Sequence, residues 1–350
     1  MKPLRVWLVG FGTVGRWLAL TLDAEAERLA ARYGVGVAVV GLANARDGFV
    51  YDADGLDLQW VLRLASEGRS LTEQPGVRHW PSAVEGLRAT EADLLVEVTA
   101  SPSVDGEPGL AHMREALRRR IPVVTSNKWP VALHGVQLAE LARAGEVAFR
   151  AESTVMSGTP VLGPLVEGLA GAVPLGLRGL LNATANFILT RMATGESYAD
   201  ALAEAQRGGL AERDPAADVE GHDTVAKLMI LSALVFGRQL RPEQVARRGI
   251  AGIARSEIDA AASGGGRLKH VATLEFSEPD GSGAVTARVE PEQVRPDDPL
   301  ASIDGTVNAV VCRARPIGEV AIAGPGAGPE LAGQGVFSDL IAVARSGPRT

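Results

Sequence analysis

A glycine-rich turn between an apolar segment and an amphipathic one sets the strongest limit on the fold of this chain. The turn Gly10-Phe-Gly-Thr-Val-Gly15 follows the apolar run Leu4–Val9 and opens a helical pattern over Thr13–Arg32. A strand, a G-x-G-x-x-G turn and a helix in this order are typical of a dinucleotide-binding unit, in which the helix N-terminus holds a pyrophosphate. The alternative is a glycine-rich turn in an unrelated α/β domain.

The rest of the first 150 residues alternates strand-like and helix-like segments. This order predicts a parallel sheet that is covered by helices on both faces. We expect further strands at Val35–Ala43, Leu94–Val98, Pro122–Thr125 and Val147–Ala151, and helices at Pro108–Arg119 and Pro130–Ala144.

The pattern changes after residue 151. A Gly/Ser/Thr-rich segment leads to a helix at Val161–Leu169, a strand at Leu175–Leu181, further helices, and alternating strand-like segments between Leu268 and Ala323. A last helix is expected at Val336–Ser346. We therefore predict an α/β protein with a Rossmann-type parallel sheet domain (1–151 with 325–350) and an α+β substrate-binding and dimerisation domain (152–324).

Composition excludes several classes of protein. The net charge of −7 and the lack of a basic stripe argue against nucleic-acid binding. A single cysteine, Cys312, excludes a disulfide framework, and no segment reaches the roughly 20 apolar residues of a membrane span. The N-terminal apolar run is too short for a secretory signal. We expect a cytoplasmic protein with a small-molecule substrate and neither nucleic-acid nor membrane partners.

Lysine is rare in this chain, with four lysines against 31 arginines. A lysine can lose its proton near neutral pH in a suitable site, whereas arginine cannot. Lys128 and Lys227 lie in polar, glycine-rich segments and are therefore candidates for acid–base chemistry. Genome composition alone could also produce this bias, and Lys128 could be a mere surface charge.

The second of these lysines ends an acidic segment. Asp223 precedes Lys227 by four residues, so both side chains share one face of the apolar helix expected at His222–Phe236. Burial there would lower the pKa of Lys227, while Asp223 would raise it. An ordinary helix ion pair beside a solvated turn is the alternative. The segment holds five carboxylates, those of Glu212, Asp214, Asp218, Glu220 and Asp223.

This segment resembles the homoserine dehydrogenase signature, A-x3-G, an apolar residue, DP-x2-D, then G-x-D-x3-K. The turn GFGTVG, the segments TSNK and NATANFILT, and the loop GPGAG agree with the family in order, so the resemblance covers nearly the whole chain. It looks like the short form, without a C-terminal regulatory domain. The signature residues are Ala205, Gly209, Leu210, Asp214, Pro215, Asp218, Gly221, Asp223 and Lys227.

The resemblance implies reversible reduction of L-aspartate 4-semialdehyde to L-homoserine with NAD(P)H, a step of threonine and methionine biosynthesis. Lys227 would donate the proton, Asp223 would orient it, and Lys128 would polarise the aldehyde or touch the nicotinamide. Delivery of a hydride to an aldehyde leaves a developing alkoxide, which needs a proton and a positively charged neighbour. Substrate binding would fall to Glu212, Asp218, Asp223 and Thr184.

The segment after the second strand bears on the choice of cofactor. Asn44 stands where an acid would bind the ribose of NAD, and Arg46 follows two residues later, which suits a 2′-phosphate. NADP is therefore preferred in this interpretation, while Asp47 keeps NAD open. The expected cofactor-binding residues are Gly10, Gly12, Thr13, Val14, Gly15, Asn44, Arg46, Thr99, Lys128, Gly209 and Gly328.

Two further expectations come from the resemblance. Backbone carbonyls of Glu152, Val155, Ser157 and Thr159 would bind a monovalent cation, sodium, unless this segment is only a hinge loop. The chain would form a homodimer.

The chain departs from the family pattern at several positions. Leu210 replaces an aromatic residue, Ala183 replaces a glycine, and Met156 and Ser157 stand where small glycine-like residues are common. These changes leave open a reductase of another small amino-acid aldehyde. A non-catalytic dinucleotide-binding sensor is a separate alternative, and the intact set of Asp223, Lys227 and Lys128 argues against it.

Overall fold

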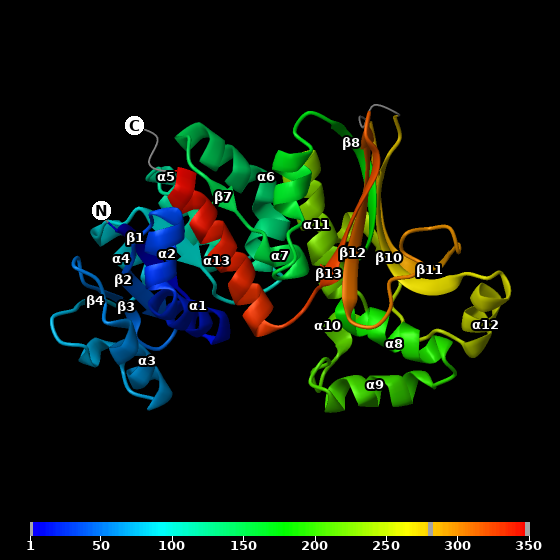
Figure 1. Cartoon of the computed structure of the whole chain (residues 1–350), viewed down its shortest axis with the longest axis horizontal. Helices are drawn as coiled ribbons and strands as arrows, with labels where there is room; N and C mark the ends of the chain where they lie inside the picture. Colours follow the sequence, from blue (N-terminus) through cyan, green and yellow to red (C-terminus); the bar gives the residue numbers. More distant parts are fainter. Residues whose placement is uncertain (1–2, 279–282, 347–350) are drawn as a thin grey trace. The chain divides into compact units, whose positions relative to one another are not determined.

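The chain forms two compact units, Met1–Gly158 with Gly328–Thr350, and Thr159–Ala327. The computed structural model describes residues 3–278 and 283–346 (Figure 1). We expected the divisions at 151 and 325, and the first lies later because helix α7 (Ser153–Met156) packs against helix α13 (Pro329–Ser346). There the Ser153 hydroxyl donates to the Ala332 carbonyl over 2.7 Å.

A seven-stranded sheet forms the centre of the first unit, in the order β4-β3-β2-β1-β5-β6-β7. The parallel part was expected. Two antiparallel strands, β3 (Gly48–Tyr51) and β4 (Arg78–Trp80), extend one edge and were not predicted. The parallel strands are β1 (Leu4–Val9), β2 (Val37–Asn44), β5 (Leu94–Glu97), β6 (Val123–Thr125) and β7 (Phe149–Arg150).

Helices cover both faces of this sheet, as predicted. Alternate side chains of β1 bury on opposite faces, Leu8 toward α1 and α13, and Trp7 toward α5. The helices on the Leu8 side are α1 (Thr13–Ala24), α2 (Ala26–Tyr33), α3 (Leu58–Ser66) and α13; those on the Trp7 side are α4 (Ala83–Ala89), α5 (Gly109–Arg118) and α6 (Lys128–Gly145).

Two helix predictions in this unit were wrong in detail. The single helix expected from Thr13 to Arg32 is interrupted at Glu25, so that α1 and α2 are separate helices. Helix α13 begins at Pro329 and not at Val336. Its first turns contain Gly333 and Gly335, which lower helix propensity but allow close packing, since a Cβ at Gly333 would come within 2.2 Å of the Trp17 ring.

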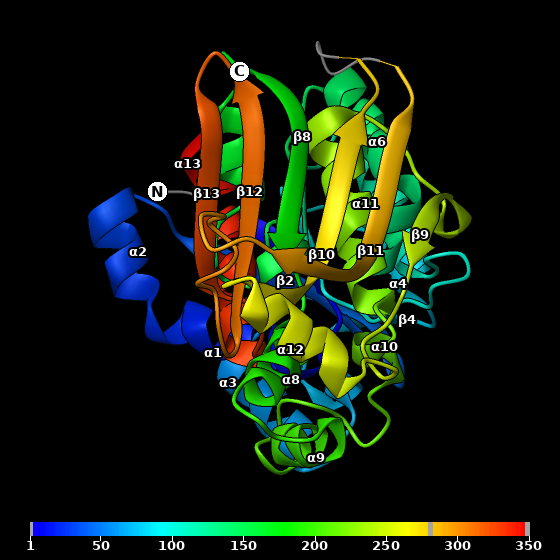
Figure 2. The ribbon, with the colours of Figure 1, turned by 90° about the vertical axis from the view of Figure 1, so that its right-hand side faces the viewer.

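The second unit is built on a six-stranded, mainly antiparallel sheet with the order β13-β12-β8-β10-β11-β9. Helix α11 lies behind this sheet in Figure 2, and the α+β prediction for this unit is confirmed. The helix expected at Val161–Leu169 is present over residues 162–168, and Pro164–Gly168 within it has π-helical geometry. The strands are β8 (Val173–Leu180), β9 (Val245–Arg247), β10 (Arg267–Phe276), β11 (Val285–Val294), β12 (Val307–Arg315) and β13 (Gly318–Pro325).

Five α-helices accompany the second sheet in the described part of the chain. Helix α11 has the bounds that the sequence predicted. No helix among the described residues is long and apolar enough to cross a membrane. The helices are α8 (Ala183–Ala193), α9 (Tyr198–Arg207), α10 (Ala216–Val219), α11 (His222–Phe236) and α12 (Arg255–Ser263).

The start of α11 is fixed by a glycine and a buried histidine. Gly221 has a φ of +84°, and a Cβ at this position would lie 3.0 Å from Cε1 of His270 on β10. Burial lowers the pKa of His270 to about 4, and its Nε2 lies 3.0 Å from the Arg248 carbonyl oxygen. An uncharged ring therefore packs under the turn that begins the helix of Lys227.

The glycines of the first turn meet different surroundings. A Cβ at Gly10, where φ is +107°, would lie 2.6 Å from the Val98 carbonyl carbon. A Cβ at Gly15 would lie 2.0 Å from the carbonyl oxygen of Gly10, whereas a Cβ at Gly12 would meet no atom within 4 Å. Packing within the unit thus requires glycine at 10 and 15, and it leaves the surface of Gly12 open.

We expect Gly15→Ala and Gly12→Ala to separate these two situations. Gly15→Ala forces backbone apart and should lower the free energy of unfolding by roughly 1–3 kcal/mol or more. Gly12→Ala should cost less than about 1 kcal/mol, because alanine is only a poorer N-cap than glycine. Thermal unfolding followed by circular dichroism measures both, and equal unfolding midpoints would contradict this account of the turn.

Candidate functional site

The carboxyl ends of the parallel strands in the first unit bring several predicted residues to one edge of the sheet. Strands β1 and β5 are neighbours, and the chain leaves them in opposite directions across the sheet, which makes this edge a topological switch point. Gly10 follows β1 there, and Thr99 follows β5. Thr13 and Val14 form the first turn of α1, with the Thr13 side chain exposed.

The turn after β2 holds the residues expected to select the cofactor. Both Asp47 oxygens accept several hydrogen bonds, from Asn44 Nδ2 (2.8 Å), Arg46 Nε (3.0 Å), the Ser70 hydroxyl (2.9 Å) and the Leu71 amide (3.3 Å). Burial alone would raise the pKa of Asp47, but the bonds from Arg46, Asn44 and Ser70 lower it to about 2. The Arg46 guanidinium also donates to the Gly68 carbonyl (2.8 Å).

Lys128 is the first residue of α6 and follows the N-cap of that helix, Asn127. Strand β6 ends shortly before, at Thr125. It is half-buried. The structure thus places Thr99 and Lys128 after neighbouring parallel strands, β5 and β6, at the same edge as the glycine turn. Parallel strands end in the same direction, so these positions gather where ligands of open α/β sheets bind.

The predicted acid–base pair of the second unit is formed and buried. Lys227 Nζ lies 2.8 Å from Asp223 Oδ2 and donates to the Leu181 carbonyl oxygen over 2.7 Å. The side chains are 9% and 11% exposed, respectively. A buried ammonium needs both a counter-charge and hydrogen-bond acceptors, and this one has an anion and a carbonyl. The pair is therefore no solvated surface ion pair.

Asn182 joins this pair to the acidic segment, and sequence reasoning did not identify it. Its Nδ2 donates to Asp218 Oδ1 (2.7 Å) and to Asp223 Oδ2 (3.1 Å). Its Oδ1 caps helix α8 by accepting from the Ala185 amide (2.8 Å). The signal was present, because an asparagine directly before a helix is a preferred N-cap. Asp218, Asp223 and Lys227 are thus held together by three helices, α8, α10 and α11.

The other expected substrate residues lie around this cluster. The Thr184 hydroxyl donates to the Leu210 carbonyl over 3.2 Å, which joins α8 to the segment after α9. Gly209 adopts a φ of +71°. Glu212 is exposed, and within the described residues no hydrogen bond or ion pair joins its carboxylate to Lys227 or to Asp218. The structure therefore brings Asp218 into the cluster and leaves Glu212 outside its bonds.

The segment expected to bind a cation is divided between the two units. Glu152, Val155 and Ser157 belong to the first, and Thr159, whose hydroxyl donates to the Pro325 carbonyl (2.8 Å), belongs to the second. Ser157 has a φ of +53°, which is uncommon for a residue with a side chain. Across residues 3–278 and 283–346 no group of three or more His, Cys, Asp or Glu could hold a metal ion.

Gly328 precedes helix α13, and its carbonyl oxygen accepts from the Ala332 amide over 2.9 Å. Its φ is +129°, so this position favours glycine. The segment belongs to the first unit, in which α13 packs against α1, the helix opened by the glycine turn.

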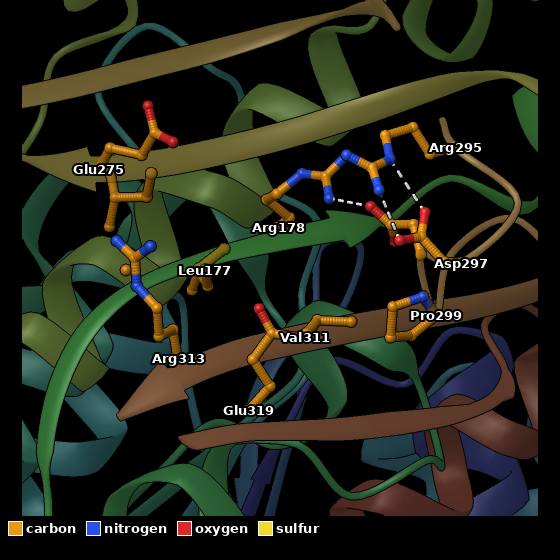
Figure 3. A pocket seen from close by; sticks show the side chains of 12 residues that line it. Leu177, Arg178, Glu275, Arg295, Asp297, Pro299, Val311, Arg313 and Glu319 are labelled. Atoms are coloured by element: carbon orange, nitrogen blue, oxygen red, sulfur yellow. Dashed lines mark hydrogen bonds and ion pairs between the residues drawn. The ribbon is translucent and has the colours of Figure 1, made fainter. Parts of the chain in front are cut away.

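A pocket of about 320 Å³ lies on the second sheet. Figure 3 shows Arg178, Arg295 and Arg313 mixed with acidic side chains along it. Arg178 is paired with Glu292 (2.6 Å) and with Asp298, and Arg295 with Asp297 (2.6 Å). Charges of both signs are thus largely balanced here. None of the residues expected to bind substrate or cofactor lines this pocket.

The chain is similar to known proteins over nearly its whole length. The family model described as homoserine dehydrogenase matches residues 160–341, and that of the homoserine dehydrogenase NAD binding domain matches residues 10–152. An NAD(+)-dependent homoserine dehydrogenase from Pseudomonas canavaninivorans is 37% identical, with 100% of this chain and 98% of the relative covered.

Two solved structures extend this similarity to the fold. A homoserine dehydrogenase from Thiobacillus denitrificans has a TM-score of 0.79 and 33% identity, covering 99% of this chain and 74% of that one. A hyperthermophilic archaeal homoserine dehydrogenase mutant in complex with NADPH has a TM-score of 0.80 and 30% identity, covering 99% of both chains. The chain therefore belongs to the homoserine dehydrogenase family and is an NAD(P)-binding oxidoreductase that acts on a CH-OH group.

Proposed function

We propose that Lys227 is the proton-transfer group in the interconversion of L-homoserine and L-aspartate 4-semialdehyde. The observation that carries this proposal is the buried Nζ of Lys227, 2.8 Å from Asp223 and 2.7 Å from the Leu181 carbonyl. The carboxylate of Asp223 and the Leu181 carbonyl orient the amine of Lys227 beside the acidic segment.

The bound nicotinamide supplies or accepts a hydride at the substrate carbon. In reduction the carbonyl oxygen becomes an alkoxide, and Lys227 stabilises the charge and then gives its proton to that oxygen. In oxidation the amine takes the proton from the homoserine hydroxyl. Asp223 holds the amine in place during both directions, because its carboxylate is itself held by Asn182.

The remaining roles concern the substrate and the cofactor. Asp218 and Glu212 bind the α-ammonium group that the substrate carries at neutral pH, and Thr184 supports the segment around Leu210. Lys128 polarises the carbonyl oxygen of the aldehyde. The position of Lys128 at the carboxyl edge of β6, beside Thr99 and the glycine turn, supports its role near the nicotinamide.

Replacement of Lys227 tests the central role. Lys227→Ala should lower kcat for homoserine oxidation on the order of 10²- to 10⁴-fold, because a general acid–base group is lost, while NADPH affinity stays within about threefold. Lys227→Arg should stay equally slow, since arginine keeps the charge but does not release its proton. The measurement is cofactor reduction followed at 340 nm.

A matched control separates proton transfer from the mere loss of an ion pair. Asp259→Asn breaks the exposed i, i+4 pair of Arg255 and Asp259 (2.9 Å) on α12 and should leave kcat unchanged. Near-normal turnover of Lys227→Ala would refute the proposed role of this lysine.

We further propose that the chain accepts both cofactors and prefers NADP modestly. Asp47, the acid nearest to the end of β2, already accepts hydrogen bonds on both oxygens and is poorly placed to bind a ribose hydroxyl as well. Arg46 is 56% exposed and lies beside Asn44. Because Arg46 is paired with Asp47, it has to give up part of this pairing to bind a 2′-phosphate, which limits the preference.

Replacement of Arg46 should therefore act on one cofactor. Arg46→Ala should raise the KM for NADP⁺ about tenfold, the value of one charge-assisted contact, and that for NAD⁺ less than twofold. Arg63→Ala, which removes an exposed arginine stacked on Trp60 of α3, is the control and should change neither KM. Equal effects of Arg46→Ala on both cofactors would show that this side chain does not select between them.

We also propose that carbonyl oxygens of Glu152, Val155, Ser157 and Thr159 bind sodium. A site of this kind needs no cluster of acidic side chains, and the unusual backbone conformation of Ser157 supports a special role for its carbonyl group. Turnover measured in sodium, potassium and tetramethylammonium salts at equal ionic strength tests this, and equal rates in all three would contradict it.

A homodimer is the assembly that we propose. Arg313 on β12 and Glu319 on β13 stand opposite each other in exposed positions, and among the described residues neither side chain has an ion-pair partner. Two copies related by a two-fold axis could exchange such partners. Light scattering coupled to size-exclusion chromatography gives the molar mass, and a monomer at micromolar concentration would contradict the proposal.

A further inference from the structure

Glu97 is a buried acid at an unusual place. It is the last residue of β5, its relative exposure is 0%, and the three residues before it in this strand are apolar. A carboxylate is almost never buried this fully unless it is paired, because removing it from water costs several kcal/mol. Strand β5 therefore ends in a carboxylate whose burial is unfavourable, at the edge of the sheet where Thr99 and Lys128 lie.

The hydrogen-bond partners of Glu97 lie at the carboxyl edge of the parallel strands, where the cofactor is expected to bind. Glu97 Oε1 accepts from the Thr99 amide (3.3 Å) and from the Thr99 hydroxyl. Glu97 Oε2 accepts from Asn127 Nδ2 over 3.1 Å, and the same Nδ2 lies 3.1 Å from the Thr99 hydroxyl oxygen. Glu97, Thr99 and Asn127 thus form a closed triangle that joins the end of β5 to the start of α6.

Asn127 is held by this triangle in an unusual way. It is the N-cap of α6, yet its side chain makes no capping hydrogen bond. An asparagine at this position ordinarily caps the helix through its side-chain oxygen, whereas Asn127 uses its side-chain NH₂ group to bind Glu97. Its backbone N–H donates to the Thr125 hydroxyl (3.0 Å), which in turn donates to the Glu97 carbonyl (2.8 Å). Side chain and backbone of Asn127 are therefore both tied to Glu97.

A second helix, α5, also contacts the carboxylate of Glu97. His112 on α5 is buried, and its Nδ1 lies 3.4 Å from Glu97 Oε1. Ser101 links the same amide of Asn127 (2.8 Å) to the first residue of α5 through the Gly109 amide (3.3 Å). The α5 backbone packs closely against this amide, since a Cβ at Gly109 would lie 2.4 Å from Asn127 Nδ2. The network ends at Asn127, the residue before Lys128.

We propose that Glu97 is a positioning residue that sets the start of α6, and so the place of Lys128, together with the Thr99 hydroxyl. This inference rests on the role proposed above for Lys128. Because Glu97 is 0% exposed, it acts on turnover through the geometry of these two residues. A glutamine in its place presents one oxygen and one NH₂ group, and the NH₂ group cannot accept from either Thr99 or Asn127.

A double-mutant cycle of Glu97→Gln and Lys128→Ala tests the inference. We expect Glu97→Gln to lower kcat about 10- to 30-fold, with the homoserine KM and the NADPH dissociation constant changed less than threefold. In the Lys128→Ala background the same change should lower kcat less than twofold further, because the residue through which it acts is already gone. Glu115→Gln, an acid on α5 paired with Arg88 (3.0 Å), is the control and should leave kcat unchanged.

The outcomes distinguish the inference from the proposal beneath it. If Lys128→Ala keeps normal turnover, the role of Lys128 is wrong, and the inference falls with it. If Lys128→Ala is slow but the two losses multiply in the double variant, or if Glu97→Gln turns over normally, only the inference is overturned. Should Glu97→Gln fail to fold by circular dichroism, Asn127→Ala, which leaves the carboxylate intact, takes its place in the cycle with the same expected values.

Discussion

The close approach of backbone between β1 and β5 is the constraint on which the first unit depends. The turn after β1 passes so near to the Val98 carbonyl that only glycine fits at position 10, and α1 begins so near to this turn that only glycine fits at 15. This contact places the N-terminus of α1 beside the carboxyl end of β5. The buried acid Glu97, the hydroxyl of Thr99 and the start of α6 then follow from the same edge of the sheet.

In the second unit, the main constraint is a buried amine, that of Lys227, which is held in one direction. Lys227 lies on a helix that is apolar on nearly all sides, so its ammonium group needs compensation from outside its own helix as well as from Asp223. The Leu181 carbonyl supplies it directly, and Asn182 supplies it indirectly by holding Asp223 and Asp218. Packing of His270 under Gly221 fixes where the helix begins and thereby which turn carries the lysine.

Local patterns predicted much of this architecture. The glycine turn, the parallel strands on either side of it and the bounds of α11 could be read directly, because hydrophobic periodicity and glycine positions are properties of short segments. Strands β3 and β4 were not predicted, because they are short and form only by pairing onto the edge of the parallel sheet. The early part of α13 was not predicted either, because its glycines serve contacts with Trp17 and Ser157 that no local pattern reveals.

The sequence by itself determined which residues can do chemistry: a rare lysine four residues after an aspartate, a second lysine after a strand, and a glycine turn for a dinucleotide. Only the tertiary structure decided that Asn182 binds two of the acids, that Glu212 stays outside their hydrogen bonds, and that Glu97 ties Thr99 to Asn127. The physical reason is that a helix face or a strand end follows from spacing along the chain, whereas hydrogen bonds between residues 30 to 46 positions apart follow from packing.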